Sequence, residues 1–183
     1  MKLNINRCCL LVIDLQERLL AHIFDKEKIK YHSNKLVDLF VELKIPIIYS
    51  EQYPKGLGNT VNCLKKKLTN CKSKRIEKTT FSVFENKDLK IFLNKNKIKQ
   101  VIILGIESHI CVLQTAIDLL KNKVQVYIVE ECVGSRKLND SNLGVRRMLK
   151  NGASLINFEM IFFELIRDSN NKLFKKLSSK YIK

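Results

Sequence analysis

The sequence lacks long apolar runs, has no tryptophan, and is poor in proline and glycine. No apolar stretch approaches the roughly 20 residues that a membrane-spanning helix needs, so we expect no membrane partner. With two prolines and six glycines it has no linker, repeat or low-complexity block, and residues 1–183 are predicted to form one domain. The first seven residues lack the pattern of a signal peptide, which favours a cytoplasmic location.

Metal-binding patterns are also missing. The three histidines follow no familiar ligand spacing and there is no Cys-x-x-Cys pair, so we expect no metal and no cofactor. Six cysteines in a chain without a signal peptide are expected to be reduced thiols. Three of them fall in or beside apolar segments and are predicted core residues, whereas two lie in lysine-rich sequence and are predicted to be exposed: Cys8, Cys9 and Cys132, then Cys63 and Cys71.

Acidic residues are few, at 18 against 34 lysines and arginines, for a net charge of +16. Such a balance suits an acidic partner such as nucleic acid. The lysines are nevertheless spread along the chain, as on solvated faces, and are dense only at residues 65–67, 72–75 and 172–183. No aromatic residue interleaves with the first two clusters, as a stacking surface for single strands requires. Nucleic acid is therefore a secondary candidate partner.

Apolar runs alternate with segments of helical periodicity along the whole chain. The runs predict strands at residues 8–13, 45–49, 75–79, 101–104, 124–129 and 155–158. The periodic segments predict helices at residues 29–43, 86–94, 108–121 and 139–150, with residues 51–60 as a loop and a basic amphipathic helix at the C-terminus. This alternation is typical of a three-layer, Rossmann-like α/β domain with a mainly parallel six-stranded sheet.

Ligands of such sheets bind beyond the carboxyl ends of the strands, where the strand order reverses. If the order is 3-2-1-4-5-6, the first and fourth strands are neighbours there. Asp14 after the first strand and Cys111 after the fourth would then meet across the crevice. Asp14 has the plainer alternative of capping the segment that follows it.

Cys111 lies where a strand passes into the first turn of a helix. Free N–H groups and the helix dipole at such a position lower the pKa of a thiol and favour the nucleophilic thiolate. The plainer alternative is a small buried apolar residue. A dyad with His109 is rejected, because residues two apart on a helix do not face each other.

Four motifs resemble those of the isochorismatase-like cysteine hydrolases, and along the chain they occur in the same order as in that family. They are Asp-Leu-Gln at residues 14–16, KTTFSVF at 78–84, GIESHICV at 105–112 and EQYPKGLG at 51–58. The last resembles the branch of isochorismatase domain-containing proteins. The resemblance extends over nearly the whole chain.

The resemblance implies an Asp14–Lys78–Cys111 triad, with Cys111 as nucleophile, Asp14 as general base or proton shuttle and Lys78 as its positive partner. It also implies a cis peptide at Ile106–Glu107 and an oxyanion hole made by the backbone amides of Glu107 and Cys111. We further expect Gln16, Tyr53, Phe81 and Phe84 to line the substrate pocket, and the ordinary alternative for the aromatic residues is packing.

Departures from the family restrict the substrate. Nicotinamidases of this superfamily bind a metal through Asp-x-His after the second strand, where this chain has Glu-Gln-Tyr at residues 51–53. The siderophore-type isochorismatases lack the cysteine. We therefore expect a metal-independent hydrolase of small amides or related C–N bonds, forming a thioester at Cys111 and assembling as a homo-oligomer. The alternative is a weakly active or inactive family member that serves as an oligomeric binding or scaffold protein. A further form of this alternative is a scaffold that associates with RNA.

Overall fold

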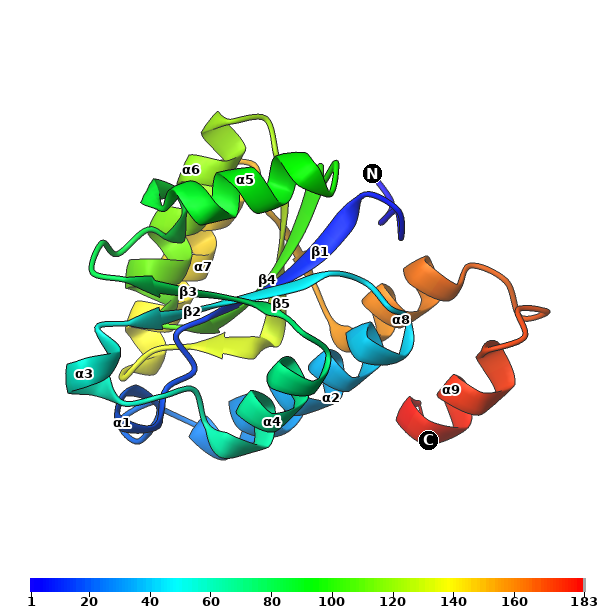
Figure 1. The fold of residues 1–183 in the computed structure, drawn as a ribbon, viewed down its shortest axis with the longest axis horizontal. Helices are drawn as coiled ribbons and strands as arrows, with labels where there is room; N and C mark the ends of the chain where they lie inside the picture. The colour runs from blue at the N-terminus through cyan, green and yellow to red at the C-terminus, as the bar shows by residue number, and fades with distance from the viewer. Residues whose placement is uncertain (183) are drawn as a thin grey trace.

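The computed structural model describes residues 1–182 and contains a six-stranded, all-parallel sheet (Figure 1). The strand order is β3-β2-β1-β4-β5-β6, so the predicted fold class and order are confirmed. In chain order the strands are β1 (Cys8–Ile13), β2 (Ile47–Gln52), β3 (Lys74–Lys78), β4 (Gln100–Ile106), β5 (Gln125–Gly134) and β6 (Ser154–Ile156). The two central strands, β1 and β4, are buried along their whole length, as their continuous apolar sequences predict.

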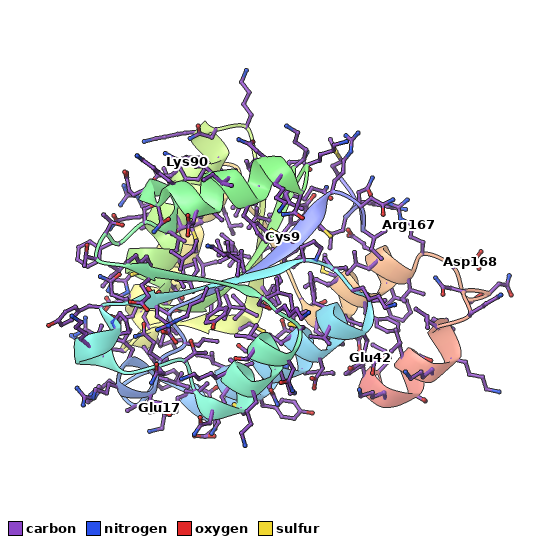
Figure 2. All side chains as sticks on the ribbon, in the orientation of Figure 1. Cys9, Glu17, Glu42, Lys90, Arg167 and Asp168 are labelled. Carbon is purple, nitrogen blue, oxygen red and sulfur yellow. The ribbon has the colours of Figure 1, made fainter. Side chains whose placement is uncertain are left out.

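Helices cover both faces of the sheet and complete three layers (Figure 1). One face carries α2 (Lys26–Glu42), α4 (Asn62–Asn70) and α8 (Phe158–Ile166), and the other carries α5 (Lys87–Lys95), α6 (Leu113–Lys121) and α7 (Leu138–Lys150). Successive strand residues point to opposite faces, so neighbours such as Cys8 and Cys9 join different apolar cores. Figure 2 labels Cys9, whose side chain is fully buried.

The shorter elements lie around this framework. They are α1 (Glu17–Leu20), α3 (Pro54–Leu57), α9 (Phe174–Tyr181), a 3-10 turn η1 (Val83–Glu85) and a π-helical turn η2 (Ser108–Val112). In Figure 1, α1 and α3 lie beyond the carboxyl ends of the strands, whereas the N-terminus lies at the amino ends. None of the helices among residues 1–182 is long and apolar enough to cross a membrane.

Several predicted boundaries are wrong. The sixth strand is Ser154–Ile156, because Asn157 caps α8 by accepting a hydrogen bond at Oδ1 from Met160 N (2.9 Å) and Phe158 already belongs to the helix. The C-terminal segment is two helices, α8 and the basic α9, instead of one. The predicted loop at residues 51–60 contains the end of β2 and all of α3, and α1 and α4 were not predicted.

Candidate active site

The carboxyl ends of β1 and β4 form the predicted crevice. The two strands pair directly, with Ile13 opposite Gly105, so the residues that follow them are neighbours. Asp14 has a left-handed backbone (φ 50°), and its amide donates to Ser50 O (3.2 Å). Its carboxylate accepts a hydrogen bond at Oδ1 from Ser50 Oγ (2.7 Å), and its side chain is fully buried. Asp14 is therefore fixed in the crevice and does not cap α1.

Lys78 closes the crevice from the end of β3. Its Nζ lies 2.7 Å from Asp14 Oδ2, and both side chains are almost completely buried. The same ammonium donates to Gln52 Oε1 (2.5 Å) and to the carbonyl oxygens of Thr80 and Phe81 (both 3.2 Å). A buried ammonium is stable only when it is paired and hydrogen-bonded in this way. Lys78 is thus held as a fixed positive charge against Asp14.

Cys111 lies in η2, between β4 and α6, and is 7% exposed. Burial, the larger cause, and the negative charge of Asp14 together raise the pKa of its thiol to about 12, although the positive charge of Lys78 acts to lower it. The structure therefore brings the three predicted residues together, but the predicted lowering of the Cys111 pKa is wrong. Burial outweighs the effect of the helix start.

The backbone around Cys111 is closely packed. Gly105 has φ +133°, and a Cβ there would lie 2.0 Å from Ile13 O, so only glycine fits. The peptide bond Ile106–Glu107 is cis, as the motif implied. Glu107 O accepts hydrogen bonds from the amides of Ile110 (3.0 Å) and Val112 (3.2 Å), which form the π turn.

The side chains that flank Cys111 have partners of their own. Glu107 Oε2 accepts from Arg136 Nε (3.0 Å), and His109 Nδ1 lies 2.9 Å from Ser135 Oγ. The ring of His109 is thus engaged with the end of β5, in line with the rejection of a Cys–His dyad.

The four predicted pocket residues have different surroundings. Tyr53 is 54% exposed and lines an open cavity of about 470 Å³ together with Lys78 and Thr80. Gln16 is fully buried and donates from Nε2 to the carbonyl oxygens of Gln52 (3.0 Å) and Gly58 (2.7 Å), so it holds the loop after β2. Phe81 and Phe84 do not line this cavity: Phe81 is 54% exposed, and Phe84 packs against the core under Lys90.

Glu51 lies near the carboxyl end of β2, in the Glu-Gln-Tyr segment at residues 51–53. Its carboxylate accepts hydrogen bonds from Thr60 N (2.6 Å), Thr60 Oγ1 (2.7 Å) and Arg75 Nε (2.8 Å). Burial alone would raise the pKa of Glu51, but these donors lower it below its ordinary value. Within residues 1–182 no group of three His, Cys, Asp or Glu side chains is arranged to hold a metal ion. This carboxylate therefore ties β2 to β3 and to the following loop.

Sequence reasoning missed Ser50 and Gln52, which hold Asp14 and Lys78. Both lie at the carboxyl end of β2, the strand next to β1. That position was the available signal, because parallel neighbours end at the same edge of the sheet.

Comparison with known proteins agrees with this architecture. A model of the Isochorismatase domain matches residues 8–160. Isochorismatase family protein 1A of Dictyostelium discoideum is 38% identical over 177 residues, which cover 96% of this chain and 86% of that protein. The chain belongs to the isochorismatase family.

Solved structures of isochorismatase-like fold superimpose closely on it. The MAR1 ribonuclease from Caenorhabditis elegans is 35% identical, has a TM-score of 0.94, and is matched over 100% of this chain and 93% of its own. The YcaC gene product of Escherichia coli, described as an octameric hydrolase of unknown specificity, is 25% identical with a TM-score of 0.91 over 99% of this chain and 91% of its own. Membership of the isochorismatase family supports a hydrolase.

Proposed function

We propose that this protein is a metal-independent cysteine hydrolase that cleaves small amides or related C–N bonds. The observation that carries the proposal is the buried Lys78–Asp14 ion pair, whose two charges both act on the Cys111 thiol. A carboxylate beside a thiol is a proton acceptor, and the fixed ammonium keeps that carboxylate ionised and oriented.

The raised pKa of Cys111 determines how the first half of the reaction proceeds. The resting thiol keeps its proton, so attack and deprotonation occur together: Sγ bonds to the carbonyl carbon while its proton passes to Asp14. The C=O π pair moves to the oxygen, where the amides of Glu107 and Cys111 stabilise the negative charge. Return of that pair breaks the C–N bond, and Asp14 gives its proton to the leaving amine.

The second half consumes one water. Asp14 accepts a proton from the water as its oxygen bonds to the thioester carbon, and collapse of the intermediate breaks the C–S bond. The sulfur then recovers its proton from Asp14, and a carboxylic acid leaves. Asp14 therefore gains and loses a proton twice per turnover, and Lys78 remains charged throughout.

The test is a screen of small carboxamides against the wild-type protein, Cys111→Ala and a matched control, Cys63→Ala. We expect turnover to fall by about 10³-fold or more in Cys111→Ala, as for removal of other covalent nucleophiles, and to be unchanged in the control. Intact mass during turnover should show the acyl group on the wild-type protein alone. Equal turnover by Cys111→Ala would refute the assignment.

The relative named as a ribonuclease makes RNA cleavage the second candidate function. That reaction breaks a P–O bond and places no acyl group on sulfur. Labelled RNA in the same assay separates the two: cleavage by the wild-type protein that Asp14→Asn abolishes, with no carboxamide turnover, favours the second function. A protein inactive on both substrates would be the scaffold alternative.

We also propose that the chain assembles into a homo-oligomer. The support is the octameric state given for the Escherichia coli relative, which matches almost the whole of this chain.

A further inference from the structure

A second concave surface lies at the amino ends of the strands, opposite the carboxyl ends that carry Cys111. It is a cleft of about 970 Å³, formed where β1, β4 and β5 begin and where α8 ends. This volume falls at the upper end of the range for ligand sites. The cleft is lined by Met1, Lys2, Asn4, Arg7, Lys99, Gln100, Lys123, Gln125, Phe163, Glu164 and Arg167. The crevice that contains Cys111 lies at the other end of the same strands, so the two sites are separated by the length of a strand.

The charge of this amino-edge cleft is strongly positive. It has five cationic side chains, all exposed, against one carboxylate: Lys2, Arg7, Lys99, Lys123 and Arg167 against Glu164. Within residues 1–182 none of the five forms an ion pair. Glu164 itself accepts a hydrogen bond from Leu3 N (2.7 Å). The cations are therefore available for an anionic ligand.

The backbone fixes the spacing of these cations. Arg7 O accepts from the amide of Lys99 (2.8 Å), and Lys99 O accepts from the amide of Gln125 (2.9 Å). Arg167, labelled in Figure 2 beyond the end of α8, donates to Leu3 O (2.7 Å). The N-terminal segment, two strand starts and the end of α8 are thus connected, so the positive charges lie along one depression.

An aromatic ring forms part of the same wall. Phe163 is 48% exposed, although its ring packs edge-on against Phe162, with centroids 5.2 Å apart. A supported ring that remains half exposed beside cations is the arrangement on which an unstacked base can stack. A double helix offers no unstacked base, and a simple anion would make no contact that requires an aromatic ring. The combination of cations and a ring therefore favours a single strand.

We propose that the amino-edge cleft binds a single-stranded polynucleotide, with phosphates on Lys2, Arg7, Lys99 and Lys123 and a base on Phe163. The proposal is independent of hydrolysis at Cys111, because the cleft and the crevice lie at opposite ends of the same strands.

The test measures fluorescence anisotropy of a labelled 12-nucleotide oligouridine. The cleft variant is Lys99→Glu/Lys123→Glu, and its matched control is Lys65→Glu/Lys66→Glu, which changes the net charge equally on α4. In about 100 mM salt we expect the cleft variant to bind at least about tenfold more weakly, with a shallower salt dependence, and the control to stay within about twofold. Equal weakening in both variants would overturn the proposal in favour of a diffuse basic surface.

A second variant tests the aromatic contact without changing the charge. Phe163→Leu should weaken oligouridine binding by about five- to a hundredfold and leave binding of inorganic polyphosphate unchanged. Unchanged oligouridine binding, or equal affinity for a duplex of the same length, would overturn the proposal. Thermal melts establish that each variant is folded. Cys111→Ala should bind like the wild-type protein, so failure of the catalytic proposal and failure of this one are distinguishable.

Discussion

At the scale of single residues, the decisive feature is the balance of forces on the Cys111 thiol. A helix start and a neighbouring lysine favour thiolate, but burial and the carboxylate of Asp14 favour the protonated form and raise the pKa to about 12. The sequence pattern indicates the helix start and, through the strand order and the family resemblance, both charged neighbours. The burial of the thiol, which is the largest influence on its pKa, exists only in the folded chain.

This balance predicts the alkylation behaviour of Cys111. Its reaction rate with iodoacetamide should rise about tenfold per pH unit from pH 7 to 9.5 without a plateau, because the thiolate fraction grows in that way well below the pKa. Asp14→Asn removes a charge that raises the pKa and should speed the reaction at each pH, whereas Lys78→Met should slow it. Intact mass with time measures each rate, with Cys63 as the reference thiol. A plateau below pH 8 would contradict the pKa direction.

At the scale of elements, the buried strands and the nucleophile segment could be predicted from sequence. Continuous apolar runs identify β1 and β4, and Gly105 marks the end of the regular β4 pattern. The surroundings of Tyr53 could not be predicted, because α3 and the loop that Gln16 ties down are held by tertiary hydrogen bonds instead of by periodicity. Asp14, Lys78 and Cys111 converge because their strands end at one edge. Their roles in catalysis stay predictions.

The tight approach of β4 to β1 predicts the effect of Gly105→Ala. A methyl group would meet Ile13 O at 2.0 Å, and the backbone has φ +133°, so we expect a loss of more than about 3 kcal/mol in the free energy of unfolding. The matched control is Gly152→Ala, where φ is +102° but the nearest atom lies 4.0 Å away, and we expect a loss of only about 1 kcal/mol. Urea unfolding of both variants measures the difference. Equal losses would show that backbone conformation, and not the contact, sets the cost.

At the scale of the whole molecule, the proposed assembly has a direct measurement. Native mass spectrometry should give a multiple of the 21.3 kDa chain mass, and the same species should persist as the protein is diluted. A monomer at micromolar concentration would contradict the proposal. On α7, the apolar side chains of Leu138 and Leu143 are each more than half exposed in the single chain, as expected of residues that a second subunit would cover.

The amino-edge cleft also belongs to this scale. It could not be predicted from the sequence, because its cations lie far apart in the chain, at Lys2, Arg7, Lys99, Lys123 and Arg167. Clusters at 65–67 and 72–75 are visible in the sequence, whereas this one exists only after strand starts and the end of α8 are brought together.

The order of the strands places Lys78 on an edge strand of the sheet. Strand β3 is outermost, pairs with β2, and alternates exposed and buried residues, whereas Asp14 and Cys111 follow strands that are covered on every side. Local unfolding of an outermost strand costs less free energy than local unfolding of the central strands. Warming should therefore separate the Lys78 ammonium from the Asp14 carboxylate while the rest of the domain is still folded, so any activity that depends on this ion pair should be lost below the temperature of global unfolding.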